Sequence, residues 1–296
     1  MTTTTQFKGV WPFLVTPLDD SGAVNTAVLN ELVESLIGAG VHGLNALGST
    51  GEFAYLNREQ KQQMVQATVD AADKRVPVVA GVAATTTVEG IRQAVEFESM
   101  GCDGLVVSIE TYFPLSDQQV IAYFTAVAES VSCPIILYTN PKFQKMILSL
   151  SVLEELAKID NIAYLKDASG DTGRLLSIMD RLGDRLGVFS ASAHVPACVM
   201  LMGGIGWMAG PACLIPKQSV ELYELVRAGQ WDKAVKLQRE LWRANEVFDK
   251  YSLAACIKGG LELQGFAVGS PLHPQAPLDE DGKAHVYSVL GTLGVV

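Results

Sequence analysis

Short apolar segments alternate with longer amphipathic segments along the chain. The short segments are rich in strand-forming residues and have the lengths of buried strands. They cover 10–16, 43–47, 76–82, 104–109, 134–139, 163–167, 187–191 and 206–210. The amphipathic segments have helical periodicity and cover 26–39, 58–72, 88–100, 117–131, 151–159, 172–182 and 195–202. The pattern predicts an α/β protein in which strands and helices follow one another in turn.

Alternating strands and helices predict a parallel sheet with right-handed crossover connections. Eight such units fit a (β/α)₈ TIM barrel, and an open doubly wound sheet is the competing arrangement. Further helices are predicted at 218–228, 231–248, 252–263 and 284–293, and no Gly/Ser linker or charge run separates them from the rest. We expect a barrel core over 1–215. Residues 216–296 would supply the last barrel helix and a C-terminal helical extension of the same domain unit.

The composition narrows the class of partner. Of 296 residues, 49% are hydrophobic and 18% are charged, and the formal net charge is -10. This charge argues against nucleic acid, which requires a basic surface. The low charged fraction favours subunit contacts, so we expect an oligomer. Five scattered cysteines and a polar start without an apolar signal segment predict a cytoplasmic protein.

Several alternative functions are disfavoured by particular segments. Residues 195–216 carry no charge over 22 positions, which is long enough for a membrane span. Pro196, Pro211 and several glycines would interrupt that helix, so we predict a buried helix and a buried strand instead, and no membrane partner. The four histidines lack metal-ligand spacing, which argues against a metal. Gly204-x-Gly206-x-x-Ala209 falls within a strand rather than before a helix, which disfavours a dinucleotide site, although a phosphorylated substrate stays open.

In a barrel of this kind, side chains at the carboxyl ends of the strands converge on the active site. Lys166 occupies such an end, within an apolar strand. An ammonium group buried there is costly unless it is paired or loses its proton, and a neutral lysine can attack a ketone. Because side chains alternate along a strand, Asp167 should face the helices and not pair with Lys166. A surface lysine on a frayed strand end is the alternative.

Two other strand ends carry candidate groups. Tyr138 lies near the end of the strand 134–139, where its phenol would enter the same barrel mouth as Lys166 and transfer protons. The turn 48–52, Gly-Ser-Thr-Gly-Glu, follows the second strand. Its hydroxyls, its backbone N–H groups and a following helix could hold a carboxylate. An ordinary core tyrosine and a simple helix cap are the alternatives.

Three motifs occur in a characteristic order: Gly-Ser-Thr-Gly-Glu at 48–52, Tyr138-x-x-Pro141, and Lys-Asp-Ala-Ser-Gly at 166–170. With this order and spacing, the chain closely resembles the dihydrodipicolinate synthase/N-acetylneuraminate lyase family, from about Phe7 to the C-terminal helices. The resemblance implies a (β/α)₈ barrel with a helical extension, usually assembled as a homotetramer (a dimer of dimers). It also implies metal-independent class I aldolase chemistry.

The resemblance assigns roles to single residues. It implies that Lys166 forms the Schiff base and that Tyr138 is the acid/base. Ser49 takes the position of a hydroxyl that relays protons, and Thr50 that of a residue binding the carboxylate of pyruvate or another 2-oxo acid. Tyr112 matches a tyrosine that reaches the relay of a neighbouring subunit.

Four further residues complete the expected substrate-binding set: Gly48, Ala191, Met208 and Phe143. Phe143 departs from the family pattern. In dihydrodipicolinate synthases, an arginine two residues past the proline holds the carboxylate of aspartate semialdehyde, and Phe143 occupies that position here. The residue directly after the tyrosine is usually asparagine in this family, but here it is Thr139. The pocket for a second substrate therefore differs from that of a lysine-biosynthesis enzyme.

We expect a lyase that forms a Lys166 Schiff base with pyruvate or a 2-oxo acid and uses no other cofactor. Its reaction would be aldol cleavage or condensation, or dehydration, of a 2-oxo-3-deoxy (sugar) acid. The rival enzyme is a true 4-hydroxy-tetrahydrodipicolinate synthase in which Lys142 or Lys145 replaces the arginine. The rival of another class is a non-catalytic sensor of 2-oxo acids.

Overall fold

The computed structural model describes residues 7–19, 21–144, 146–191 and 195–296. In these ranges, parallel strands form one eight-stranded sheet in the order β1-β8-β7-β6-β5-β4-β3-β2. The strands are β1 Gly9–Pro12, β2 Leu44–Ala46, β3 Val78–Ala84, β4 Gly104–Ile109, β5 Ile135–Thr139, β6 Ile162–Asp167, β7 Gly187–Ser190 and β8 Gly206–Ala209. Each of the predicted strands is therefore present.

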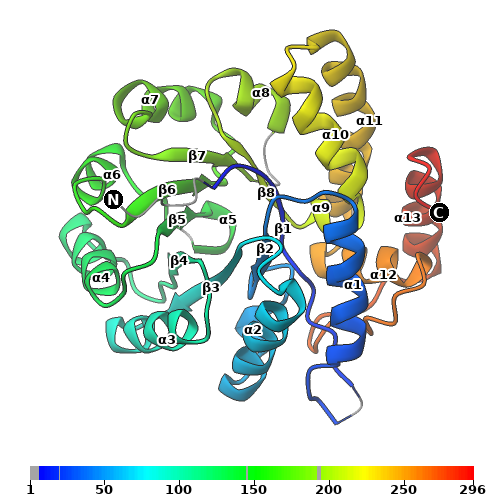
Figure 1. Ribbon diagram of the computed structural model, residues 1–296, viewed down its shortest axis with the longest axis horizontal. Helices are drawn as coiled ribbons and strands as arrows, with labels where there is room; N and C mark the ends of the chain where they lie inside the picture. The colour runs from blue at the N-terminus through cyan, green and yellow to red at the C-terminus, as the bar shows by residue number, and fades with distance from the viewer. Residues whose placement is uncertain (1–6, 20, 145, 192–194) are drawn as a thin grey trace.

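The contact between β1 and β2 closes the sheet into a barrel (Figure 1). Phe13 and Asn45 form an isolated parallel bridge, and the Leu14 N–H donates to the Asn45 carbonyl at 2.9 Å. The Asn45 side-chain amide also donates to the carbonyls of Trp11 and Pro12, at 3.0 and 3.1 Å. The predicted (β/α)₈ barrel is confirmed, and the open doubly wound sheet is wrong.

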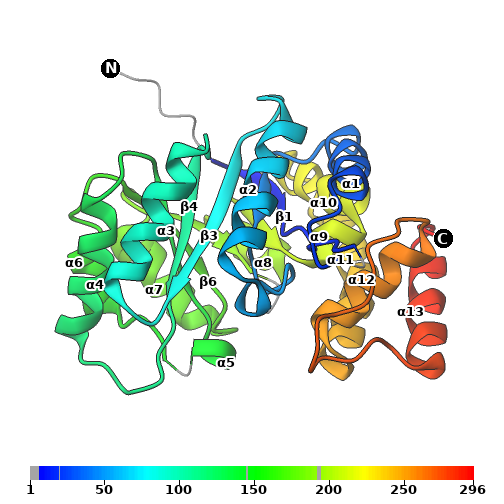
Figure 2. The same ribbon diagram turned by 90° about the horizontal axis from the view of Figure 1, so that it is seen from below.

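Helices surround the barrel on all sides (Figures 1 and 2). The helices between strands are α1 Thr26–Gly38, α2 Arg58–Ala72, α3 Thr87–Ser99, α4 Asp117–Glu129, α6 Leu150–Leu156, α7 Thr172–Leu182 and α8 Pro196–Leu201. After β8 come α10 Pro216–Arg227, α11 Trp231–Lys250, α12 Leu253–Leu263 and α13 Glu280–Thr292. All of them were predicted. Three short helices were not: η1 Phe53–Tyr55, α5 Pro141–Gln144 and α9 Pro211–Leu214.

Local sequence determines where several helices begin. The side chains of Asn57 and Ser116 accept hydrogen bonds from the N–H groups of Gln60 and Gln119. In return, the glutamine side chains accept hydrogen bonds from the backbone N–H groups of Asn57 and Ser116. These reciprocal capping boxes satisfy N–H groups that otherwise lack partners at a helix start. Asp171 caps α7 in a simpler way, by accepting from the Arg174 N–H. The predicted starts of these three helices are correct.

The first strand is shorter than predicted, because it ends at Pro12 rather than at residue 16. Proline has no N–H to donate to a ladder. Beyond it, the Phe13 N–H donates to the Ala209 carbonyl while Leu14 bonds to Asn45, so the chain changes from one neighbouring strand to the other. Residues 13–16 are buried, which explains their apolar pattern without a longer strand.

The uncharged stretch 195–216 contains the predicted buried helix and strand, which are α8 and β8, and also the short helix α9, which was not predicted. Among the described residues, no helix is long and apolar enough to cross a membrane.

Aromatic side chains fill the interior of the barrel. Phe7, Trp11, Tyr164 and Phe189 form a chain of ring contacts with centroid distances between 4.9 and 6.3 Å. Phe13 belongs to the same buried cluster, nearer the carboxyl ends of the strands. The barrel interior is therefore a packed core.

Candidate active site

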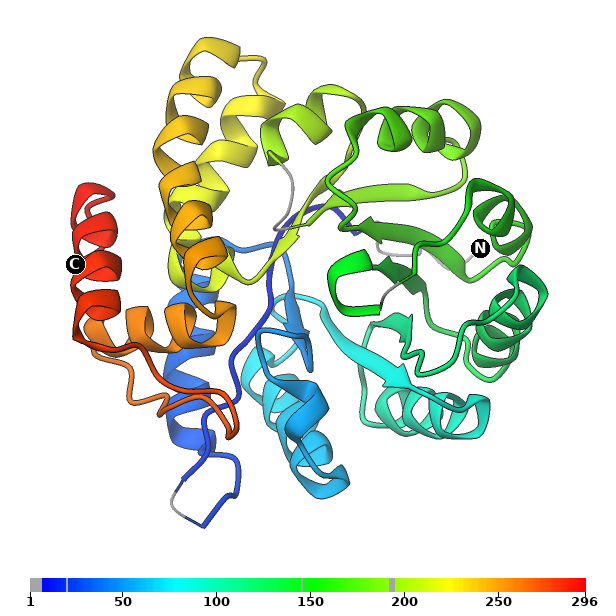
Figure 3. The ribbon, with the colours of Figure 1, turned by 180° about the vertical axis from the view of Figure 1, so that it is seen from behind.

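A cavity of about 310 Å³ lies at the carboxyl ends of the strands, beside the short helix α5, which crosses this end of the barrel (Figure 3). The side chains that line it come from the turn after β2, from η1, β4, β5 and α5, and from residues that directly follow β3, β4 and β5. The lining residues are Ser49, Phe53, Thr85, Ser108, Glu110, Thr111, Tyr112, Tyr138, Asn140, Phe143 and Gln144. Four residues predicted for the site, Ser49, Tyr112, Tyr138 and Phe143, are therefore brought together.

Lys166 lies beside this cavity on β6 and is 5% exposed. Its Nζ is 3.9 Å from the centroid of the Tyr138 ring and 4.1 Å from that of the Phe13 ring. Burial among these rings lowers the pKa of the Lys166 ammonium to about 7, because desolvation disfavours the charged form. A large fraction of the amine is neutral near neutral pH, and the alternative of an exposed lysine on a frayed strand is wrong.

The alternation predicted for β6 is confirmed. Asp167 is 0% exposed and faces α7, where its Oδ2 accepts a hydrogen bond from Nε of Arg174 at 2.9 Å. Its Oδ1 accepts from the Ser169 N–H at 2.8 Å. The Asp167 carboxylate is thus used to hold the loop after β6 to α7.

The Tyr138 hydroxyl is at the centre of a small polar network. It accepts a hydrogen bond from Nδ2 of Asn140 at 2.8 Å, and the Ser49 side chain lies near it in the same cavity. Burial raises the pKa of the Tyr138 phenol, and the side chains of Asn140 and Ser49 oppose that rise. The phenol is therefore neutral at pH 7. It can donate its proton to one group only if it accepts a proton from another at the same time.

The turn 48–52 is tightly constrained. Gly48 has no room for a side chain, since a Cβ there would lie 2.1 Å from Cδ1 of Phe13. Thr50 is buried, and the Thr16 hydroxyl donates to the Gly51 carbonyl at 2.7 Å. No carbonyl of the described residues accepts from the N–H groups of Ser49 or Thr50. Thr50 does not line the cavity, whereas Ser49 does.

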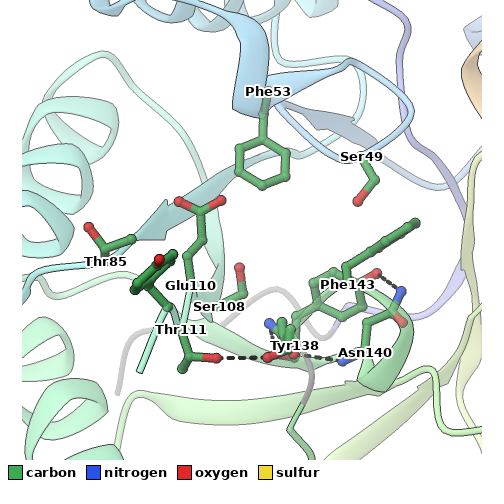
Figure 4. A pocket seen from close by; sticks show the side chains of 11 residues that line it. Ser49, Phe53, Thr85, Ser108, Glu110, Thr111, Tyr138, Asn140 and Phe143 are labelled. Atoms are coloured by element: carbon green, nitrogen blue, oxygen red, sulfur yellow. Dashed lines mark hydrogen bonds between the residues drawn. The ribbon is translucent and has the colours of Figure 1, made fainter. Parts of the chain in front are cut away.

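The helix that follows this turn is α2, which begins at Arg58 as predicted, but the single 3₁₀ turn η1 lies between the turn and α2. An α-helix N-terminus thus does not point at the site from the turn. The ring of Phe53, the first residue of η1, extends into the cavity instead (Figure 4).

Phe143 lines the cavity on α5 and is 59% exposed. Lys142, the neighbour considered as a substitute for the missing arginine, pairs with Asp249 at 3.2 Å and is not a lining residue. Lys145 lies outside the described residues. Glu110 is the charged residue among those that line the cavity, and its carboxylate extends toward the Phe53 ring (Figure 4).

Two predicted contact residues do not reach the cavity. Ala191 and Met208 are 1% and 0% exposed, and neither lines it. Met208 packs in the barrel interior in the same buried cluster as Phe13. Met208 therefore lies in the core below the site. Its position near the end of a strand did not show whether its side chain would line the cavity or pack in the core.

Sequence reasoning also missed several lining residues, among them Glu110 and Asn140. Both stand directly after predicted strands, at 104–109 and 134–139, so their positions were a usable signal. Thr85 directly follows β3 but lies three residues past the predicted end of that strand, and Phe53, in η1, lies six residues past the end of the predicted strand 43–47.

Tyr112 lies at the outer edge of the cavity and is 86% exposed. Its ring packs edge-on against that of Phe113, itself 73% exposed, with centroids 4.9 Å apart. Two adjacent aromatic rings thus project from the chain beside the cavity.

Among the described residues, no group of three or more His, Cys, Asp or Glu side chains is arranged to hold a metal ion. His194 lies outside them.

Comparison with known proteins places this geometry in a family. The model of the dihydrodipicolinate synthetase family matches residues 6–293. A 4-hydroxy-tetrahydrodipicolinate synthase from Acidiphilium cryptum is 31% identical over 290 residues, which are 98% of this chain and 99% of the relative.

Solved structures agree with the sequence relatives. A putative dihydrodipicolinate synthetase from Pseudomonas aeruginosa superimposes with a TM-score of 0.93 at 29% identity, covering 97% of this chain and 100% of that chain. YagE, a prophage protein of the dihydrodipicolinic acid synthase family from E. coli K12, was solved in complex with pyruvate. It has a TM-score of 0.93 at 29% identity and covers 99% of this chain and 100% of its own. The chain belongs to the dihydrodipicolinate synthetase family.

Proposed function

We propose that the protein is a lyase that forms a Schiff base between Lys166 and the C2 carbonyl of pyruvate or a 2-oxo-3-deoxy acid. The observation that carries this proposal is the buried Lys166 amine, whose pKa is about 7, in contact with the Tyr138 ring beside the cavity. A neutral amine next to a proton-transferring phenol is the combination that iminium chemistry requires. The pyruvate complex of YagE supports the same class of ligand.

The chemistry needs no metal or further cofactor. The amine adds to the ketone and, with loss of water, gives an iminium. In cleavage, the C4 hydroxyl loses its proton toward Tyr138, the C3–C4 bond breaks, and its electron pair moves to the iminium to form an enamine. An aldehyde leaves, C3 takes up a proton, and water releases pyruvate. In dehydration, C3 loses a proton and the C4 hydroxyl leaves as water.

In both cleavage and dehydration, Tyr138 needs a second group that takes up the phenol proton. Because burial keeps the phenol neutral, it accepts a substrate proton as it passes its own on. The Ser49 hydroxyl, which lies near the phenol in the same cavity, is the group that would take that proton. The amides of Ser49 and Thr50, which no described carbonyl accepts, would hold the substrate carboxylate.

The second half of the substrate is proposed to be hydroxylated rather than anionic. Phe143 offers no hydrogen bond to a carboxylate, Lys142 is engaged with Asp249, and Glu110 would repel a second negative charge. A carboxylate such as Glu110 accepts hydrogen bonds from sugar hydroxyls. These groups favour a 2-oxo-3-deoxy sugar acid, or a related 4-hydroxy-2-oxo acid, over aspartate semialdehyde.

Condensation of pyruvate with aspartate semialdehyde is the second candidate, because relatives such as the Acidiphilium cryptum protein are named 4-hydroxy-tetrahydrodipicolinate synthase. Steady-state kinetics on both substrate classes, side by side, distinguish the two. An efficient condensation that no hydroxylated acid approaches would overturn the first choice.

Trapping with pyruvate and borohydride tests the Schiff base itself. Reduction fixes a three-carbon adduct on the attacking amine, and peptide mass mapping locates it. We expect the adduct on Lys166, with Lys166→Ala as the blank. An adduct on Lys258, or none, would overturn the mechanism. A wild-type protein that forms the adduct but turns over no 2-oxo acid would instead be the sensor.

We also propose a homotetramer in the cytoplasm. The exposed pair Tyr112 and Phe113 beside the cavity is consistent with burial by a second copy, and the five cysteines are free thiols, as a reducing compartment would leave them. One neighbour of similar fold is described as a monomeric variant, so sedimentation is the direct measurement.

A further inference from the structure

Glu52 and Lys258 form an interior ion pair that the proposed reaction does not use. Oε2 of Glu52 is 2.6 Å from Nζ of Lys258, and the two side chains are 0% and 2% exposed. Desolvation of two charges can exceed the attraction between them, so a pair of this kind is weak evidence for a role in stability alone. Its location points to a more specific role.

Glu52 ends the turn that carries Ser49 and Thr50. Its backbone is left-handed, with φ of 57°, and Leu47 at the other end of the turn has φ of 59°. Left-handed non-glycine residues are strained and persist only where the surrounding structure holds them in place. The turn therefore depends on contacts from outside itself.

Every side-chain contact described for Glu52 comes from the C-terminal part of the chain. Oε1 accepts from the Leu272 N–H at 2.7 Å and from Nε2 of Gln275 at 3.0 Å. Lys258, on α12, also donates to the Ser270 carbonyl at 3.0 Å. Since α12 packs against α9, which follows β8, the extension is anchored to the barrel as it holds the turn (Figure 2).

The contact from Glu52 to the proton relay is short. The Glu52 N–H donates to the Ser49 carbonyl at 3.1 Å, and the Ser49 side chain lies near the Tyr138 phenol in the same cavity. A shift of Glu52 would therefore move Ser49 relative to the phenol. Misplacing a catalytic group by 1 Å can cost about 10²-fold in rate.

We propose that Glu52 and Lys258 are positioning residues, through which the C-terminal extension holds the Ser49 hydroxyl against Tyr138. The extension is then a structural part of the active site and not only a covering of the barrel. This inference rests on the proposed function, because it assigns Ser49 and Tyr138 to proton transfer.

The test uses pyruvate alone, so that the physiological substrate need not be known. The rate at which wild-type protein exchanges the C3 protons of pyruvate for deuterium, followed by proton NMR in D₂O, reports proton transfer. Borohydride trapping on the same samples reports Schiff-base formation. Glu52→Gln keeps the size of the side chain and an acceptor for the Leu272 N–H, but it removes the charge that pairs with Lys258.

We expect Glu52→Gln to trap pyruvate on Lys166 and to exchange protons at least about 10-fold more slowly than wild type at saturating pyruvate. Glu96→Gln is the matched control. The Glu96 carboxylate pairs with Arg58 and Arg92 between the outer helices α2 and α3, and its loss should leave exchange unchanged. Circular dichroism confirms that each variant is folded.

A double-mutant cycle separates positioning from general destabilisation. If Glu52 acts through Ser49, then Glu52→Gln should change the exchange rate by less than about 2-fold in a Ser49→Ala background. Should the single variant not fold, Glu52→Gln/Lys258→Met removes both charges, and the same cycle applies to that pair.

The inference is overturned if folded Glu52→Gln exchanges at the wild-type rate, or if its full loss persists in the Ser49→Ala background. Failure of the proposed function looks different, because wild-type protein itself would then neither trap pyruvate on Lys166 nor exchange its C3 protons.

Discussion

At the scale of single residues, Lys166 shows how burial makes a nucleophile. The aromatic rings of Phe13 and Tyr138 surround its amine, and desolvation lowers its pKa from 10.5 to about 7. A fully hydrated lysine would be almost entirely protonated at neutral pH. The barrel thus provides a reactive amine without a neighbouring base.

The lowered pKa predicts the pH dependence of Schiff-base formation. The attacking form is the neutral amine, so the rate of trapping should rise as pH increases through 7 and level off above about pH 8. Initial rates of cyanoborohydride trapping with pyruvate, quantified by mass spectrometry, measure this profile. A rate that is still rising tenfold per pH unit at pH 9 would show an ordinary lysine and contradict the burial argument.

Tyr138→Phe should separate binding from proton transfer. The variant keeps the ring that contacts Lys166, so we expect it to form the pyruvate adduct. It loses the phenol, and C3 proton exchange should fall by about 10²–10⁴-fold. Tyr164→Phe is the control, because that hydroxyl accepts from the Phe7 N–H at 2.9 Å within the barrel, away from the cavity. Near-normal exchange in Tyr138→Phe would remove Tyr138 from its role.

Phe143 is expected to decide which second substrate is accepted. Phe143→Arg would offer two charge-assisted hydrogen bonds to a carboxylate, worth about 1.5–3 kcal/mol, and should raise kcat/KM for aspartate semialdehyde about 10- to 100-fold. Lys142→Met should leave that value unchanged, since the Lys142 ammonium pairs with Asp249. Steady-state kinetics on both variants check this. A large loss in Lys142→Met would show that the lysine replaces the arginine.

At the scale of elements, the contact between β6 and α7 holds the strand that carries Lys166. Asp167 is fully buried and paired with Arg174, whose guanidinium also donates to the Leu148 carbonyl. An unpaired buried carboxylate is costly, so Arg174→Met should lower the free energy of unfolding by about 3–5 kcal/mol. Denaturant unfolding with a two-state fit measures it.

Arg181→Met on the same helix is the matched control. Arg181 pairs with Glu154, but both side chains are largely exposed, at 58% and 41%. Exposed pairs contribute about 0–1 kcal/mol. If both variants lost the same free energy of unfolding, the buried pair of Asp167 and Arg174 would contribute no more to stability than an exposed pair.

At the scale of the whole molecule, the exposed rings of Tyr112 and Phe113 lead us to expect that a neighbouring copy completes the site. Lys166→Ala and Tyr112→Phe subunits should each be impaired alone. After mixing and reassembly, some sites would combine both wild-type side chains, and activity should partly return. Sedimentation that finds a fully active monomer would contradict this.

The strand and helix pattern was readable from sequence because it depends on short-range properties. Periodicity, capping residues such as Asn57 and Ser116, and chain-breaking prolines act within a few residues. The elements that were missed, η1, α5 and α9, are three or four residues long and too short to show a period.

The sequence by itself determined the barrel, the family, and the candidate pair Lys166 and Tyr138, because strand order places their strand ends in one barrel mouth. Only the tertiary structure decided which neighbours those groups meet. It placed Met208 in the core and Glu110 in the cavity, and it brought Lys258 to Glu52 across 206 positions of the chain. Burial and pairing depend on contacts between distant segments, and no local pattern encodes them.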